Sequence, residues 1–358
     1  MFCGALRRTG RAGIVARMAN VLLSLGHGYT AQALARRLLR AGWQVIGTTR
    51  DPAKAERLRA EGVEAVVWPD VCATTATPAN PGSARPAGVG GEAPAPGGAG
   101  RALPGLAPGR QEGRPPGDDA LTDALSRATH LLTSIAPRDG RDPVLAAARD
   151  TIAAAAPHLR WAGYLSTTGV YGDHAGGWVD EDTPLSPATA RGRARAAAEA
   201  DWQALAREAG LPLHIFRLAG IYGPGRGPFT RLRDGTARRI VKPGQVFSRI
   251  HVEDIATVLM ASIARPNPGA VYNVCDDDPA PPQDVTAFAA GLIGLPPPPE
   301  EPFDPDGMSP MAASFYAESK RVRNDRIKRE LGVRLAYPGY REGLAAVLAA
   351  EAVNRPPA

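Results

Sequence analysis

The chain has 358 residues, which is long enough for one large α/β domain or for a main domain with a smaller lobe. Its formal charge of +6 arises from 42 basic and 36 acidic residues. These charges are mixed along the chain, whereas a nucleic-acid-binding protein would gather its basic residues on one face, so we expect no nucleic-acid partner. The 3 cysteines are far apart and lack metal-ligand spacing, so we expect neither a metal site nor a disulfide framework.

No segment has the features of a membrane span or of a secretory leader. No apolar run approaches the roughly 20 residues that a helix needs to cross a bilayer. Residues 1–19 are basic but lack the apolar stretch of a secretory signal. We therefore expect an N-terminal extension over residues 1–19, no membrane association, and a cytoplasmic protein.

From Asn20 onward the sequence alternates between strand and helix patterns. Strands are predicted at 21–25, 43–48 and 63–68, because short apolar runs end there in glycine or polar residues. Between them, apolar residues recur at helical spacing after residue 30, and a second helix is predicted over 52–61. This βαβαβ opening predicts a Rossmann-type, doubly wound parallel sheet.

The alternation is interrupted and then resumes. Residues 71–118 are dominated by Pro, Gly and Ala, so they bury too little apolar surface to offset their ordering entropy, and a disordered insertion is predicted. Further strands are predicted at 129–135, 161–165 and 213–218, with helices at 143–156 and 187–210 between them. We expect an NAD(P)-binding domain over 20–222, a C-terminal substrate lobe over 223–348 with elements that return to the core, and a tail over 349–358.

A glycine-rich turn follows the first strand and opens the first helix. Gly26, Gly28 and Ala31 fit the pattern G-x-G-x-x-G/A, in which the glycines allow a tight turn and close approach of a diphosphate. The helix N-terminus then supplies unpaired N–H groups to the phosphates. The candidate cofactor-binding residues are Gly26, His27, Gly28, Tyr29, Thr30, Ala31, Thr49, Arg50, Ser134, Ile135, Ala136, Leu218, Ala219 and Gly220.

The end of the second strand indicates which dinucleotide is bound. NAD-binding proteins place an acidic residue about 20 positions after the glycines, where it bonds the ribose hydroxyls. Here that place holds Thr49 and Arg50, and a guanidinium suits a 2′-phosphate. Because Asp51 adjoins Arg50, NAD stays open as the alternative to NADP.

Four later motifs resemble those of one family. They are S-T-T-G-V-Y-G at 166–172, R-L-A-G-I-Y-G-P-G at 217–225, R-I-H-V-E-D-I-A at 249–256 and Y-N-V at 272–274. The chain therefore resembles the extended short-chain dehydrogenase/reductase family, which includes the NAD-dependent epimerases and dehydratases. The resemblance implies a small-molecule substrate, with a nucleotide-sugar-like molecule as one option, and it implies a homodimer by analogy.

The family's catalytic Tyr-x-x-x-Lys pair is missing. Thr167 falls at the position of the family's Ser/Thr, which polarises the substrate oxygen. Arg191 and Arg195 stand where the tyrosine and lysine are expected. Arginine does not donate protons near neutral pH, but Arg195 could hold the ribose as a lysine would. This departure is similar to an atypical, YeeZ-like group of the family.

Each of the other candidate residues has two interpretations. Tyr171 and Tyr222 each follow a core strand, so either could face the nicotinamide or could be a packing residue. Arg249, Lys320 and Arg321 could meet an anionic substrate, with a solvated basic surface as the alternative for the last two.

Two functions stay open at this point. The first is an NAD(P)-binding oxidoreductase or epimerase-like enzyme that acts on an alcohol, aldehyde or sugar carbonyl, with Thr167 near the reacting carbon. The second is a non-catalytic NAD(P)H-binding sensor or scaffold, which the arginines at 191 and 195 favour.

Overall fold

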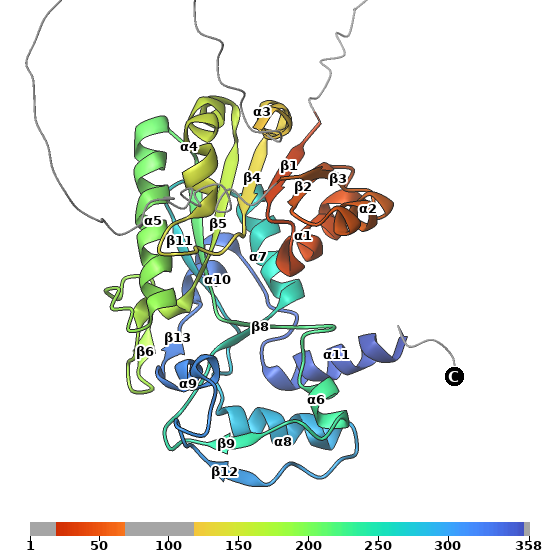
Figure 1. Cartoon of the computed structure of the whole chain (residues 1–358), viewed down its shortest axis with the longest axis vertical. Coiled ribbons are helices and arrows are strands. Elements are labelled where there is room, and N and C mark those ends of the chain that lie inside the picture. The colour runs from red at the N-terminus through yellow and green to blue at the C-terminus, as the bar shows by residue number, and fades with distance from the viewer. Residues whose placement is uncertain (1–18, 69–117, 354–358) are drawn as a thin grey trace, which may run out of the picture.

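The computed structural model describes residues 19–68 and 118–353, and its centre is a seven-stranded parallel sheet (Figure 1). The strand order is β11-β7-β5-β4-β1-β2-β3. The bounds are β1 (Val21–Leu25), β2 (Gln44–Thr49), β3 (Glu64–Val67), β4 (His130–Thr133), β5 (Trp161–Thr167), β7 (Leu213–Leu218) and β11 (Val271–Val274). The predicted Rossmann-type doubly wound fold is confirmed. The chain reverses its direction of winding between β1 and β4, and such a switch point is where α/β sheets bind ligands.

Helices cover both faces of the sheet. They are α1 (Tyr29–Arg40), α2 (Pro52–Ala60), α3 (Asp118–Arg127), α4 (Pro143–Ala155), α5 (Ala190–Ala209), α7 (Val252–Ala264) and α10 (Asp325–Leu331). Alternate strand residues point to opposite faces, so Leu22 packs in the cluster with α1 and α7, whereas Leu23 packs in the cluster with α4 and α5. The sheet is therefore buried on both sides, which explains its nearly continuous apolar strands.

A smaller lobe lies beyond the end of the sheet (Figure 1). It contains three short parallel strand pairs and four helices. These are β8 (Gly220–Tyr222) with β10 (Arg249–His251), β9 (Arg239–Val241) with β12 (Glu300–Pro302), β6 (Trp178–Val179) with β13 (Arg321–Val322), and the helices α6 (Phe229–Arg233), α8 (Pro282–Leu292), α9 (Pro310–Tyr316) and α11 (Tyr340–Val353). The lobe has its own small core, in which Tyr222, Phe229 and Leu344 are buried together.

Several boundaries differ from those predicted. Strand β5 continues to Thr167, two residues beyond its predicted end, because it pairs with β7 along its whole length. Helix α5 starts at Ala190, since the side chain of Thr189 accepts the Gly192 amide and caps the helix there. Helix α11 continues to Val353, past the predicted start of the tail at 349.

The predicted extension and insertion fall almost wholly outside the described residues, which include only Ala19 of the first and Asp118 of the second. Within the described ranges, no helix has both the length and the apolar character that a bilayer span requires.

Candidate functional site

The glycine turn is wedged between the ends of β2 and β4. Gly26 has a φ of 78°, and a Cβ placed on it would lie 2.5 Å from Cγ1 of Ile135, so glycine is required there. Its N–H donates to Oγ1 of Thr48 at 2.8 Å, and its carbonyl accepts the Ser134 hydroxyl. The turn is thus fixed at the switch point of the sheet.

The next glycine faces open space at the start of α1. A Cβ on Gly28 would meet no heavy atom closer than the Gly26 carbonyl oxygen, at 3.7 Å. Gly28 is the N-cap of α1, and no side chain of residues 19–68 or 118–353 caps that helix, whereas Asp51 caps α2 and Thr189 caps α5. An uncapped helix N-terminus with clear space before it fits the diphosphate of a dinucleotide.

Two basic residues flank the end of β2. Arg50 is exposed directly after the buried Thr49, and Lys54 lies half-buried in the first turn of α2. Oδ1 of Asp51 accepts the Ala53 amide at 2.9 Å and so caps α2. The sequence analysis missed Lys54, although a cation in the first turn of a helix opposes the helix dipole and is a signal for a nearby anion.

His27 fills the space between the turn and β2. The backbone N–H of His27 donates to the Thr48 carbonyl at 2.9 Å, and a Cβ placed on Gly47 would lie 2.8 Å from the His27 ring. The ring is buried, and in the part of the chain that the structure describes neither ring nitrogen has a hydrogen-bond partner. Burial, and then the nearby Lys54, lower the pKa of His27 to about 4, so the ring is neutral at pH 7.

The other candidate contacts lie along the same edge of the sheet, because strands β7, β5, β4 and β1 are neighbours and run in parallel. These contacts are Ser134, Ile135 and Ala136 after β4, Thr167 at the end of β5, Leu218 at the end of β7, and Ala219 and Gly220 after it. Ala219 donates its N–H to the Val274 carbonyl at 3.0 Å, and Gly220 begins β8. Thr30 and Ala31 are buried in the first turn of α1, so they pack the helix against the sheet.

Thr167 caps the short 3₁₀ turn Thr168–Tyr171 (η3). Its Oγ1 accepts the Gly169 amide at 3.2 Å. The side chain is half-buried at the strand end. The oxygen therefore has a backbone-bonding role, and the hydroxyl hydrogen can be donated elsewhere.

Tyr171 belongs to a buried polar network. Its hydroxyl accepts from Nη1 of Arg217 at 2.9 Å and donates to Oδ1 of Asn273 at 2.8 Å. Arg217 pairs with Glu199 at 2.8 Å, and Glu199 also accepts the Ser166 hydroxyl. Burial raises the pKa of Tyr171 to about 12. The Tyr171 side chain is fully buried, and both of its hydroxyl bonds are to protein side chains. A catalytic role for Tyr171 stays a prediction.

The two arginines at the missing Tyr-x-x-x-Lys positions behave differently. Arg191 is exposed on α5. Arg195 donates from Nη1 to the Tyr164 hydroxyl and to the Leu165 carbonyl, both at 3.0 Å. Arg195 therefore projects from α5 toward β5, the strand that carries Thr167.

Tyr222 packs inside the lobe, and His251 and Asp254 of the R-I-H-V-E-D motif bond backbone groups. Tyr222 is buried in the lobe, where it packs edge-on against His251. Nδ1 of His251 accepts the Glu253 amide and caps α7. Asp254 accepts the amides of Ala336 and Tyr337 at 2.8 and 2.9 Å, which ties α7 to the segment before α11.

Lys320 and Arg321 are not placed to meet a substrate near Arg249. The Lys320 ammonium donates to the Gly172 carbonyl and pairs with Glu318, each at 2.7 Å. Arg321 donates to the Gly176 carbonyl. Both side chains thus hold the loop after η3 against β13.

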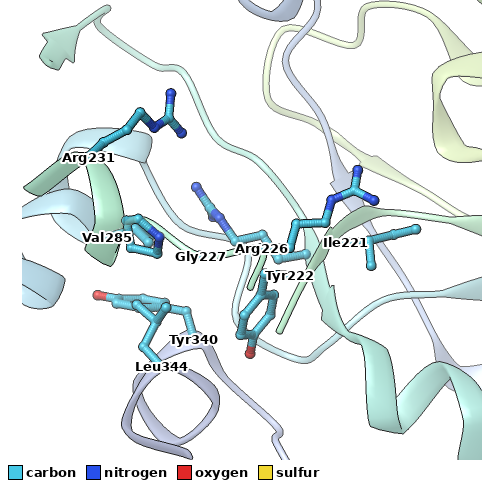
Figure 2. A pocket seen from close by; sticks show the side chains of 10 residues that line it. Ile221, Tyr222, Arg226, Gly227, Arg231, Val285, Tyr340 and Leu344 are labelled. Atoms are coloured by element: carbon cyan, nitrogen blue, oxygen red, sulfur yellow. The ribbon is translucent and has the colours of Figure 1, made fainter. Parts of the chain in front are cut away.

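A pocket of about 330 Å³ lies between β8, β10, α6, α8 and α11 (Figure 2). Its lining residues are Ile221, Tyr222, Arg226, Gly227, Pro228, Arg231, Arg249, Val285, Tyr340 and Leu344. The pocket is linked to the cofactor turn, because Tyr29, the first residue of α1, donates its hydroxyl to the Pro224 carbonyl at 2.9 Å. Arg226 lies over the same tyrosine ring, at 5.9 Å from its centroid.

Known proteins resemble the chain in both sequence and fold. The family model described as "NAD dependent epimerase/dehydratase family" matches residues 141–275. Protein YeeZ from Escherichia coli (strain K12) is 32% identical over 222 residues, which are 60% of this chain and 74% of YeeZ.

Solved structures match nearly the whole length. A functionally unknown conserved protein from Silicibacter pomeroyi is 55% identical, with a TM-score of 0.75 over 93% of this chain and 99% of its own. A dTDP-glucose 4,6-dehydratase from Bacillus anthracis, solved in complex with NAD, is 15% identical, with a TM-score of 0.65 over 94% of this chain and 97% of its own. The chain therefore belongs to the NAD dependent epimerase/dehydratase family, as a homologue of Protein YeeZ.

Proposed function

We propose that the chain is an NADP(H)-dependent oxidoreductase or epimerase-like enzyme that acts on an alcohol, aldehyde or sugar carbonyl. The observation that carries the proposal is the arrangement at the end of β2, next to the uncapped N-terminus of α1. There Arg50 and Lys54 supply positive charge, and Asp51 turns one carboxylate oxygen, Oδ1, to the cap of α2.

The preference for NADP follows from charge and geometry. A 2′-phosphate is a doubly charged oxyanion, and a guanidinium and an ammonium are both suited to bind it. Lys54 has no ion pair within the described ranges, although it is half-buried at a helix N-terminus where the dipole disfavours a cation. A bound phosphate removes that unfavourable interaction.

Chemistry is assigned to the edge of the sheet near Thr167. When bound, the nicotinamide ring supplies or accepts a hydride. The Thr167 hydroxyl, whose oxygen is held by the Gly169 amide, donates its hydrogen to the substrate oxygen. Arg195 uses Nη1 to contact β5, and we assign its other N–H groups to the ribose. A water molecule takes over the proton transfer for which the family uses a tyrosine.

Titration of NADPH and NADH by fluorescence tests the cofactor assignment. We expect Arg50→Gln and Lys54→Gln each to weaken NADPH binding about tenfold or more, because each removes a charge-assisted contact, and to leave NADH binding unchanged. Arg57→Gln, an exposed arginine one turn further along α2, is the control and should change neither. Equal loss of NADPH and NADH affinity in the two test variants would refute the phosphate assignment.

Single-turnover oxidation of NADPH against a panel of aldehydes, ketones and sugar carbonyls tests the chemistry. We expect absorbance at the nicotinamide band to fall with at least one compound, and Thr167→Ala to slow that step. Absence of turnover across the panel, with NADPH binding intact, would overturn the enzymatic assignment.

A non-catalytic NADPH-binding sensor or scaffold is the second candidate. It is favoured by the positions of three side chains: Arg191 is exposed, Arg195 is bound to β5, and Tyr171 is enclosed in the buried network. This candidate predicts NADPH binding without turnover. It is wrong if Thr167→Ala changes a measured rate.

A further inference from the structure

The pocket of the lobe combines three arginines with an apolar wall. Arg226, Arg231 and Arg249 come from the loop after β8, from α6 and from β10. Figure 2 shows Arg226 and Arg231 above Tyr222, Tyr340 and Leu344, which form the opposite side. Segments far apart in the sequence thus bring guanidinium groups and apolar side chains together in one pocket.

Within the described residues, no carboxylate forms an ion pair with these three arginines. Arg249 donates from Nη1 to two backbone carbonyls, those of Phe247 and Ala280, at 2.9 and 3.0 Å. By contrast, Arg233, on the same helix as Arg231, pairs with Glu351 at 3.0 Å. The pocket therefore carries positive charge that the surrounding side chains leave uncompensated.

The carboxyl of Asp276 interacts electrostatically with Arg249 but does not cancel this charge. Asp276 is buried and lies outside the pocket lining. Burial raises the pKa of Asp276 to about 8, so this carboxyl is mostly protonated at pH 7. Whatever the protonation of Asp276, three guanidinium groups without a carboxylate partner among the described residues line the pocket.

We infer that this pocket binds an organic phosphate monoester with a compact apolar or aromatic body. Guanidinium forks bind phosphate oxygens through paired charge-assisted bonds, and three of them match a dianion. Tyr340, Val285 and Leu344 offer apolar contact for the body of the ligand.

The lining argues against a larger polar ligand. It contains no Asn, Gln, Asp, Glu, Ser or Thr side chain to bond the edge of a base or the hydroxyls of a sugar. Its volume of about 330 Å³ lies at the small end of the range for small-molecule sites. The pocket thus fits a small phosphorylated molecule better than a nucleotide diphosphate sugar.

The role of this ligand as substrate rests on the proposed function, whereas its binding does not. Arg226, which lines the pocket, lies over the ring of Tyr29, the first residue of α1, at 5.9 Å from the ring centroid. A ligand held by Arg226 would therefore lie near the bound dinucleotide.

Isothermal titration of the full chain with phenyl phosphate, with and without NADPH, tests the inference. We expect saturable binding that Arg226→Gln and Arg231→Gln each weaken about tenfold to a hundredfold. Arg233→Gln, the control on α6, should leave it unchanged. The variants replace exposed side chains, and their melting temperatures verify folding.

Four results would overturn the inference. If phenyl phosphate does not bind while NADPH still does, the proposed phosphate site is wrong and the cofactor assignment stands. If inorganic phosphate binds as tightly as phenyl phosphate, the pocket makes no favourable apolar contact with the ligand. If benzoate binds as tightly, the pocket has no preference for a phosphate group. Tighter binding of UDP-glucose that depends on the same arginines removes the restriction to a compact ligand.

Discussion

The buried pair of Glu199 and Arg217 gives the sharpest stability prediction. Their side chains are 3% and 6% exposed, and the guanidinium makes three contacts with the carboxylate, at 2.8, 3.2 and 3.2 Å. Glu199→Gln leaves Arg217 charged and enclosed, with an amide in place of its counter-ion. Breaking a buried pair in this way costs about 3–5 kcal/mol. Since a domain has about 5–15 kcal/mol of stability in total, this is a large fraction.

Urea unfolding followed by tryptophan fluorescence measures the loss, because Trp161 and Trp202 are both fully buried. The control is Glu208→Gln on the same helix. It breaks a pair with Arg149 whose side chains are 63% and 36% exposed, and this change should cost less than about 1 kcal/mol. The double variant Glu199→Leu/Arg217→Met should lose less than the sum of its two single changes, since no charge is left buried. An equal loss for Glu199→Gln and Glu208→Gln would refute the reasoning.

Three further predictions follow from single features. Gly26→Ala should abolish measurable NADPH binding and lower the free energy of unfolding by more than about 1 kcal/mol, because a Cβ at a φ of 78° meets Ile135. The control, Gly42→Ala, has a φ of 77° but lies in open space, so it should keep its NADPH affinity. NADPH titration and thermal melting compare the two variants. Four histidines have a pKa lowered mainly by burial to about 4: His27, His130, His214 and His251. Between pH 6.5 and about 4 the unfolded chain binds protons that the native chain does not, so the free energy of unfolding should fall as the pH falls through this range. Above pH 6.5 these histidines should not change the free energy of unfolding. Urea unfolding at pH 7, 5.5 and 4.5 checks this prediction. Tyr171→Phe should lower the free energy of unfolding by about 1–2 kcal/mol, because Arg217 loses a buried hydrogen-bond partner. The variant should keep any NADPH turnover rate of the unaltered chain. A loss of turnover at normal cofactor affinity would instead show that Tyr171 is catalytic.

The sequence predicted the half of the site that depends on local order. The run Val21–Leu25, the glycines after it and the helix that follows are neighbours in the chain, so periodicity and turn chemistry were sufficient to predict the turn. The pocket of the lobe was not predictable in the same way. Arg226, Arg231 and Tyr340 line one space only because α6 and α11 both pack against α8, and no local pattern encodes that arrangement.

Tyr171 shows a second limit of sequence reasoning. A tyrosine just after a strand can point to the open edge or turn inward, and the motif around it is the same in both cases. The outcome depends on Arg217 and Asn273, which lie on β7 and β11 and bond its hydroxyl from the inside. The alternative that it is a packing residue, left open by the sequence, is the one that its surroundings favour.

Strand β11 has a consequence for how the chain can be divided. It comes after much of the lobe in the sequence, yet it forms the outer strand of the main sheet, where Val271–Val274 pair with Ile215–Leu218. A fragment that stops at Tyr222 would keep the cofactor turn but leave β7 with a free edge of unpaired amides and carbonyls. Long apolar edges of this kind recruit other strands and aggregate. The fragment that ends at Tyr222 is therefore expected to be soluble only when the downstream sequence is supplied, in the same chain or as a complementing fragment.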